Sequence, residues 1–295
     1  MVAICIAVAA CAPVDSASTS TTSTTALAPT GSVEPIATTT SGATTLAPEV
    51  GSLLVFGDWG SGTADQTAVA SAMARYVAEN RLAAVLTTGD NFYSDDAELL
   101  LEPLAWVFDR DIPFWITWGN HDVESSSRVE AVEEAFESPP RWTVHEWGEV
   151  DVVILDSNQV GSTEQLEFLT GMLEGSENPA VVVFHHPPLS CSSHGDTGTV
   201  LDNWVPVFDE DVVMVLSGHD HNYQRFEKSG VSYVVSGGGG NRLYELRACT
   251  AGHPERIAGE AFHHFLVLTQ SLHEINVDVV DVNGEVIDSF AVGLP

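Results

Sequence analysis

Five apolar segments of this 295-residue chain are each followed, within a few residues, by a polar side chain of a kind that binds metal ions. The length and composition of these segments are typical of buried strands. The segments are Ser52–Phe56, Ala83–Leu86, Pro113–Trp118, Ala180–Phe184 and Val212–Leu216. In open α/β sheets, ligands bind beyond the carboxyl ends of the strands. We therefore expect the five polar clusters to meet in one site.

The polar clusters offer oxygen and imidazole donors and no thiolate, a set that suits iron, manganese or zinc. The side chains delivered by the five strands are Asp58, Asp90 with Tyr93, Asn120 with His121, His185, and His219 with His221. A single Gly-Asp pair or a lone histidine after a strand is common and indicates little. Five such clusters in chain order are hard to obtain by chance, so they predict a shared metal site.

The segment Gly89-Asp90-Asn91-Phe92-Tyr93 indicates which metals to expect. An aspartate such as Asp90 can bridge two cations through its two oxygens. Tyr93 can bind one of them only as phenolate, and a free phenol has a pKa of about 10. Holding the phenolate near neutral pH requires a strong Lewis acid, which favours a ferric ion over zinc or magnesium alone. The alternative is that Tyr93 is a packed aromatic side chain beside Phe92.

The spacing of apolar residues predicts the remaining elements. Helices are expected over Ala64–Glu79, Glu98–Phe108, Val129–Phe136, Thr163–Leu173 and Val200–Phe208, and a hairpin over Trp142–Trp147 and Val150–Asp156. Further strands are expected at Tyr223–Phe226, Val231–Val235, Phe265–Thr269, Ile275–Val280 and Val286–Val292. A first part that alternates strand and helix, followed by a strand-rich part, predicts a two-sheet sandwich flanked by helices in one domain, residues 49–295.

Five motifs carry a family resemblance, and they are Gly57-Asp58-Trp59-Gly60, Gly89-Asp90-Asn91-Phe92-Tyr93, Gly119-Asn120-His121-Asp122, Val183-Phe184-His185-His186-Pro187 and Gly218-His219-Asp220-His221. Together they resemble the blocks of calcineurin-like metallophosphoesterases and, more narrowly, of short single-domain purple acid phosphatases. The resemblance covers residues 51–240. General metallophosphoesterases carry a histidine where this chain has Gly60, and Tyr93 can supply the ligand that is lost there.

The resemblance implies an α/β (α+β) fold of four layers, a two-sheet β-sandwich flanked by helices. It implies a ferric ion held by Asp58, Asp90, Tyr93 and His221, and a divalent iron, zinc or manganese ion held by Asp90, Asn120, His185 and His219. His121 would donate a proton to the leaving group or stabilise the transition state, and His194 matches a substrate-binding histidine of the family. The alternative for His194 is an exposed loop histidine.

These roles imply an exported phosphatase that hydrolyses small phosphate monoesters by attack of a metal-bound hydroxide, an acid-phosphatase-like phosphoric ester hydrolase. Two alternatives stay open. One is a phosphodiesterase or nucleotide pyrophosphatase with the same centre, because the ligands alone do not fix the leaving group. The other is a surface-anchored binding protein with a degenerate site, whose signature would be missing ligands, and none is missing.

The start of the chain resembles a bacterial lipoprotein signal, although a basic region is absent and the apolar run is short. Residues 1–11 form this segment, with Cys11 as the lipidation candidate, and the alternative is a frayed apolar terminus. Residues 12–48 are rich in Ser, Thr, Ala and Pro and predict a disordered tether. We therefore expect the protein to lie outside the cytoplasm, either as a cell-surface lipoprotein or as a secreted protein. Contact with a membrane is expected only through the lipid anchor.

Acidic residues outnumber basic ones 42 to 10, which gives a formal net charge of −32. Such a field repels long polyanions, so we expect no nucleic-acid partner and a preference for small phosphate esters. The sequence leaves the oligomeric state open. Cys191 and Cys249 lie on predicted loops, where either a disulfide or two free thiols is possible.

Overall fold

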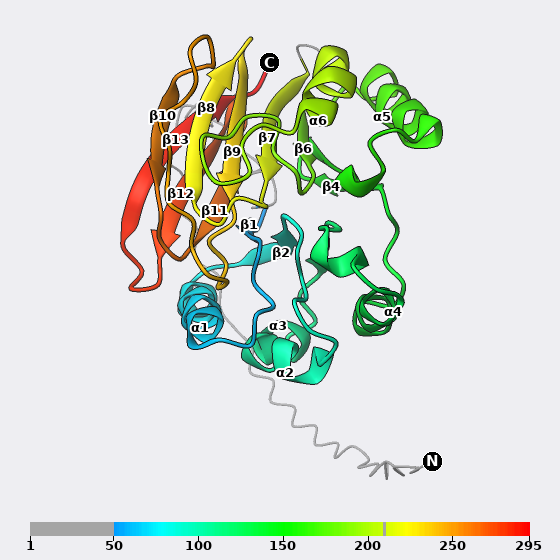
Figure 1. Ribbon diagram of the computed structural model, residues 1–295. Helices are drawn as coiled ribbons and strands as arrows, with labels where there is room; N and C mark the ends of the chain where they lie inside the picture. The colour runs from blue at the N-terminus through cyan, green and yellow to red at the C-terminus, as the bar shows by residue number, and fades with distance from the viewer. Residues whose placement is uncertain (1–49, 209–210) are drawn as a thin grey trace, which may run out of the picture. The chain divides into compact units, whose positions relative to one another are not determined.

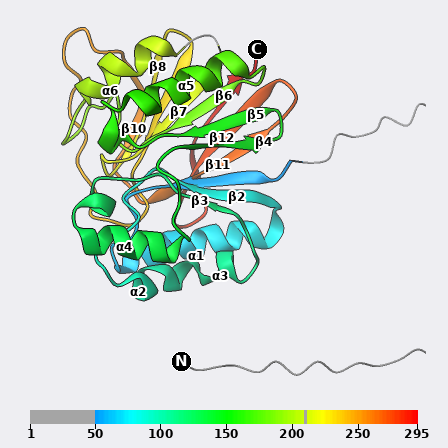
Figure 2. The ribbon, with the colours of Figure 1, turned by 90° about the vertical axis from the view of Figure 1, so that its right-hand side faces the viewer.

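The computed structural model describes residues 50–208 and 211–295. The predicted signal segment with Cys11 and the predicted tether, residues 12–48, lie outside these ranges. Two β-sheets stack face to face, and helices cover the outer faces (Figure 1; Figure 2). The predicted two-sheet sandwich flanked by helices is therefore confirmed.

The first sheet has six strands in the order β13-β12-β11-β1-β2-β3. Strands β1, β2 and β3 are parallel, and β11, β12 and β13 continue the sheet in antiparallel fashion. The strands are β1 (Ser52–Phe56), β2 (Leu82–Thr87), β3 (Phe114–Trp115), β11 (His264–Gln270), β12 (Glu274–Asp281) and β13 (Val286–Gly293).

The second sheet has seven strands in the order β10-β8-β9-β7-β6-β5-β4. The strands β5, β6, β7 and β9 are parallel, and the others pair in antiparallel fashion. The strands are β4 (Thr143–Trp147), β5 (Val150–Ile154), β6 (Ala180–Val183), β7 (Val212–Ser217), β8 (Tyr223–Lys228), β9 (Val231–Ser236) and β10 (Arg256–Glu260).

Helices α1 to α4 cover the first sheet, and α5 and α6 cover the second (Figure 2). The helices are α1 (Ala64–Glu79), α2 (Ala97–Leu101), α3 (Ala105–Phe108), α4 (Ser126–Ala135), α5 (Thr163–Gly175) and α6 (Gly198–Asn203). The side chain of Thr63 caps α1 by accepting a hydrogen bond from the backbone N–H of Gln66. No helix among the described residues combines the length and apolar character needed to cross a membrane.

Alternate residues of each central strand face different cores, which explains why these strands are apolar throughout. In β1, Leu53 and Val55 pack between the two sheets, against residues such as Leu216 of β7. Leu54 and Phe56 face the other way, onto a second core that includes residues of α1. A third core lies between the second sheet and α5. Central parallel strands such as β1, β6 and β7 are thus buried on both faces, as parallel strands usually are.

Some predicted elements differ from those observed, and one observed strand was not predicted. The expected helix Val200–Phe208 ends at Asn203, and a 3-10 turn follows at Val205–Val207. The expected helix Glu98–Phe108 is interrupted by a 3-10 turn at Glu102–Leu104. A proline occupies the start of this turn, where the backbone N–H that proline lacks would have no partner within the helix. The expected strand Pro113–Trp118 pairs only at Phe114–Trp115. Strand β10 was not predicted, because its sequence Arg-Ile-Ala-Gly-Glu has no apolar run and is mostly exposed.

Candidate metal centre

The candidate ligands leave the strands through tight turns at the carboxyl ends of both sheets. Asp58, Asp90 and His219 all have positive φ angles, of 58°, 50° and 69°. Non-glycine residues rarely adopt this conformation, which costs free energy and often marks a functional site. Gly89 shows how tightly the turns pack: a Cβ there would lie 2.6 Å from the His185 Nδ1 atom. The local backbone therefore holds the side chains close together.

The first donor set surrounds the Tyr93 hydroxyl. This oxygen lies 3.2 Å from Asp58 Oδ1, 3.1 Å from Asp90 Oδ2 and 3.1 Å from His221 Nε2. His221 Nε2 also lies 3.3 Å from Asp58 Oδ1. The structure thus brings together all four residues that were predicted to hold the ferric ion.

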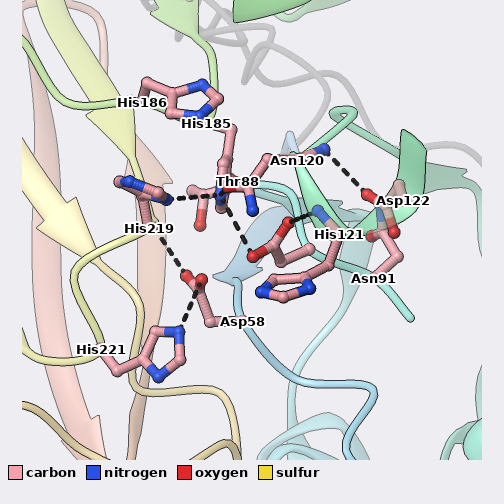
Figure 3. Close-up of polar contacts among 12 residues, drawn as sticks. Asp58, Thr88, Asn91, Asn120, His121, Asp122, His185, His186, His219 and His221 are labelled. Carbon is pink, nitrogen blue, oxygen red and sulfur yellow. Dashed lines mark hydrogen bonds and ion pairs between the residues drawn. The ribbon is translucent and has the colours of Figure 1, made fainter. Parts of the chain in front are cut away.

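The second donor set surrounds His185 Nε2. This nitrogen lies 3.1 Å from Asn120 Oδ1, 3.2 Å from His219 Nδ1 and 3.3 Å from Asp90 Oδ2. The four residues predicted to hold the divalent ion therefore also converge. Figure 3 shows His185, Asn120 and His219 on one side of Asp58 and His221 on the other.

Asp90 belongs to both sets, but not in the way that its two oxygens suggested. Its Oδ2 atom faces both Tyr93 and His185. Its Oδ1 atom accepts a hydrogen bond from the backbone N–H of His121 at 2.8 Å. The expectation of one oxygen per cation is therefore not met, because the turn at Asn120 and His121 uses the second oxygen as a backbone anchor. A single oxygen remains to link the two sets.

The donor geometry fits metal ions. Ligand atoms about 2.1 Å from one ion and at right angles to one another are separated by roughly 3 Å. The other donor atoms lie 3.1 to 3.3 Å from the Tyr93 hydroxyl oxygen in the first set or from His185 Nε2 in the second. Within the first set, burial and the negative charges of Asp58 and Asp90 raise the pKa of Tyr93 well above 10. The surrounding protein thus opposes the phenolate, so only a strongly Lewis-acidic cation could hold it.

Two candidate ligands have their ring orientation fixed by backbone carbonyl groups. His185 Nδ1 lies 2.9 Å from the carbonyl oxygen of Thr88, and His221 Nδ1 lies 2.7 Å from that of Arg242. A carbonyl oxygen only accepts, so in each neutral ring Nδ1 carries the proton and Nε2 offers a lone pair to the centre. This tautomer is the one that a metal ion needs.

The charges of the centre shift the pKa values of its groups. Burial lowers the pKa of His185, but Asp90 and then Asp58 raise it more, to about 9. Burial raises the pKa of Asp90, but His185 and the backbone N–H of His121 lower it more. Burial, His185 and His186 lower the pKa of His219. The cluster therefore attracts positive charge, and a cation would take the place of the His185 Nε2 proton.

Gly60 explains why Tyr93 and not a histidine completes the first donor set. A Cβ at Gly60 would lie 1.7 Å from the carbonyl oxygen of Asn91. The carbonyl oxygen of Gly60 accepts a hydrogen bond from the backbone N–H of Tyr93 at 2.8 Å. A side chain at position 60 would push this loop away, so the missing histidine and the presence of Tyr93 depend on each other.

The two predicted catalytic histidines lie beside the donor sets. The ring of His121 lies 4.5 Å from that of Tyr93, and its Nδ1 atom lies 3.0 Å from Glu124 Oε2. The ring of His194 lies 4.1 Å from that of His219. The His121 side chain is 38% exposed, so a substrate could reach it. Neither histidine is among the donor atoms that converge on Tyr93 or His185.

Three supporting residues were missed by the sequence reasoning. Asp122 is buried and accepts hydrogen bonds from the backbone N–H groups of Phe92 and Gly119. Burial and the charge of Asp90 raise its pKa to about 7. Asp220 accepts a hydrogen bond from the backbone N–H of His194, and Tyr244 stacks on His221 with 4.1 Å between ring centroids. Asp122 and Asp220 stand inside the quoted motifs, whereas no sequence signal marked Tyr244.

A disulfide joins Cys191 and Cys249, with an S–S distance of 2.04 Å. It is one of the two alternatives that the sequence left open. The bridge links the loop that carries His194 to the segment that carries Tyr244. Both of these side chains contact histidines of the centre. The disulfide therefore ties together two loops at the rim of the site.

Comparisons with known proteins indicate the family of the chain. A profile described as calcineurin-like phosphoesterase matches residues 51–223. The chain is 26% identical over 229 residues to purple acid phosphatase 4 of Arabidopsis thaliana, which covers 64% of this chain and 68% of that protein. It is 24% identical over 232 residues to purple acid phosphatase 7 of the same plant, covering 65% and 71%.

Two solved structures share the fold. One is a purple acid phosphatase from yellow lupin (Lupinus luteus) seeds, with a TM-score of 0.72 and 17% identity. The similarity covers 84% of this chain and 54% of the lupin chain, so this protein spans about half of the lupin enzyme. The other is GAP50 of Plasmodium, described as an anchor in the inner membrane complex, with a TM-score of 0.70, 17% identity and coverage of 84% and 90%.

Proposed function

The chain belongs to the calcineurin-like phosphoesterase family and is a metal-dependent phosphoesterase, and we propose that it is a purple-acid-phosphatase-type enzyme acting on small phosphate monoesters. One observation carries the proposal. The Tyr93 hydroxyl converges with Asp58, Asp90 and His221 within 3.2 Å, and Asp90 also faces the second donor set. The convergence of a phenol with these donors supports a strongly Lewis-acidic ion at this position.

The proposal assigns a ferric ion to the set of Asp58, Asp90, Tyr93 and His221. It assigns divalent iron, zinc or manganese to the set of Asp90, Asn120, His185 and His219. When bound, such a pair of ions polarises a phosphoryl group and lowers the pKa of water, so that a nucleophile is available under acidic conditions.

The side chains around the ligands would do the remaining work. His121 is partly exposed and its backbone N–H is anchored on Asp90, which places its ring where a leaving oxygen can take a proton from it. His194 lies over His219 and would donate a hydrogen bond to a phosphoryl oxygen. Tyr244 covers the face of His221 and helps to exclude water from the first donor set.

Small substrates are favoured by charge. The net charge of −32 repels a long polyphosphate over many phosphates, whereas a single ester reaches the centre more easily. Location outside the cytoplasm is part of the proposal, supported by the lipoprotein-like sequence that ends in Cys11 and by the Cys191–Cys249 disulfide. A phosphodiesterase or nucleotide pyrophosphatase with the same centre is the alternative that the test must separate.

The test is a metal analysis of the purified protein combined with pH profiles on a phosphate monoester and a phosphate diester. We expect one iron and one further metal ion per chain, and higher kcat/KM for the monoester, with activity retained below pH 6. Comparable turnover of long single-stranded DNA, or a preference for the diester, would contradict the substrate assignment. Failure to bind any metal would contradict the enzyme mechanism itself.

A further inference from the structure

His186 directly follows His185, and neither donor set uses it. Its ring centroid lies 4.9 Å from that of His185 and 4.5 Å from that of His219. One ring nitrogen from each of these three histidines lies within 4.8 Å of those of the other two. Figure 3 shows the three rings on the same side of the site. A nitrogen of His186 therefore faces the imidazole-rich half of the centre.

The hydroxyl of Ser157 determines which ring nitrogen of His186 carries the proton. Ser157 Oγ accepts a hydrogen bond from the backbone N–H of His186 at 3.0 Å and lies 2.8 Å from its Nδ1 atom. Ser157 is 7% exposed, and its hydroxyl has no other hydrogen-bond partner among the described residues. A buried hydroxyl left without an acceptor costs about 1–3 kcal/mol. The O–H group therefore donates to Nδ1, and the neutral ring carries its proton on Nε2.

This tautomer is the reverse of that in two of the candidate ligands, His185 and His221. In His185 and His221, Nδ1 faces a backbone carbonyl oxygen and must carry the proton, so Nε2 has a free lone pair. In His186 the Nε2 atom carries a proton and cannot bind a metal ion without losing it. His185 and His186 are adjacent in the chain, but Nε2 of His185 offers a lone pair and Nε2 of His186 offers an N–H group.

We infer that His186 is a neutral hydrogen-bond donor to a phosphoryl oxygen of the substrate, on the side of His185 and His219, and that Ser157 is its positioning residue. The inference rests on the proposed phosphatase function, which places a phosphoryl group there. The side chain of His186 is partly exposed, so a ligand can reach it. A donor fixed before the reaction stabilises developing negative charge without reorganisation.

The experiment compares His186→Ala, His186→Gln and Ser157→Ala with the wild type, and His273→Gln is the matched control. A glutamine side chain keeps a neutral N–H donor of similar reach but is a poor ligand for iron or zinc. His273 is an exposed histidine on the turn between β11 and β12, away from the donor sets. For each protein we measure the metal content, the affinity of the metal-loaded form for inorganic phosphate by calorimetry, and kcat and KM for a monoester.

In His186→Ala we expect both metal ions to remain, phosphate to bind more weakly, and kcat/KM to fall about 100-fold, as when one oxyanion donor is removed. His186→Gln should recover most of both losses, and Ser157→Ala should show a smaller loss of the same kind. His273→Gln should match the wild type.

Loss of the divalent ion in both His186 variants would overturn the inference and make His186 a ligand. Unchanged phosphate affinity and turnover in His186→Ala would also overturn it, as would a glutamine variant no better than alanine. If Ser157→Ala behaves as the wild type, the positioning role is wrong. A wild type that binds metals and phosphate but hydrolyses no ester would instead contradict the proposed function, and the phosphate affinities would still decide the role of His186.

Discussion

The two halves of the candidate centre differ in the charge of their donors. Asp58 and Tyr93 give the first half two oxygen donors of its own, with His221 as the one imidazole. The second half has two imidazoles, from His185 and His219, and the neutral amide of Asn120. Hard anionic oxygens favour a more highly charged ion, whereas neutral nitrogen donors suit divalent zinc or iron. This difference between the halves would suit two different ions.

Both halves nevertheless draw on both sheets. Strands β1, β2 and β3 of the first sheet lead to Asp58, Asp90 and Asn120, and strands β6 and β7 of the second lead to His185 and His219. The candidate centre lies where the carboxyl ends of the parallel strands of the two sheets meet. Its geometry thus depends on the packing of one sheet against the other, and the single oxygen of Asp90 joins the halves.

The largest effect is expected from Asp90→Asn, because this change affects both halves at once. The substitution replaces the charged carboxylate, whose Oδ2 atom faces both donor sets, with a neutral amide. We expect both metal ions to be lost, with affinity falling by more than the roughly 100-fold that loss of an outer partner costs. Metal analysis after dialysis measures how much of each ion the variant retains. Retention of either ion at full occupancy would show that Asp90 does not link the halves.

The next effect is expected from His121→Ala, which separates chemistry from metal binding. We expect kcat to fall about 100- to 10,000-fold, as for the loss of a general acid. Both halves should keep their ions, because no donor atom converging on Tyr93 or His185 comes from His121. Paired measurements of kcat and metal content test this, with His273→Ala as the control. Loss of metal would make His121 a ligand and change the assignment of the first half.

A smaller effect is expected from Asp122→Asn, which removes a support and leaves all ligands in place. Asp122 accepts hydrogen bonds from Phe92, Gly119 and the Asn91 side chain, and an amide would turn its NH2 group toward one of these donors. The resulting unsatisfied buried groups should cost about 1–3 kcal/mol of unfolding free energy. Denaturant unfolding and metal titration test this, and metal affinity should fall about tenfold. No change in either quantity would show that the two loops do not depend on Asp122.

Much of the site could be predicted from the sequence because each ligand lies on the loop that follows a strand. A buried strand is recognisable from its apolar run, and its end fixes where the next side chains emerge, as at Asp58 and His185. The single-oxygen role of Asp90 could not be predicted, because the backbone N–H that uses the other oxygen comes from a distant loop. Tyr244 was missed for a related reason: it lies in the segment Gly237–Pro254, which has no regular secondary structure and no periodic pattern.

The strand that was missed, β10, has no apolar run in its sequence. Central strands such as β1 and β7 are buried on both faces, so composition alone identifies them. The edge strand β10 is mostly exposed, and its pairing with β8 depends on backbone hydrogen bonds that leave no hydrophobic pattern. Whether such a segment forms a strand is determined by its tertiary context and not by its local sequence.

The assignment of the first half rests on a phenolate bound to ferric iron, and visible absorption of the iron-loaded protein measures this bond. Charge transfer from Tyr93 to a ferric ion predicts a broad visible band in the wild type. In Tyr93→Phe we expect the band to disappear while the second metal ion remains, with Tyr76→Phe as a control that keeps the colour. A wild type that is colourless and fully active with zinc alone, or a Tyr93→Phe variant that keeps the band, would contradict the account.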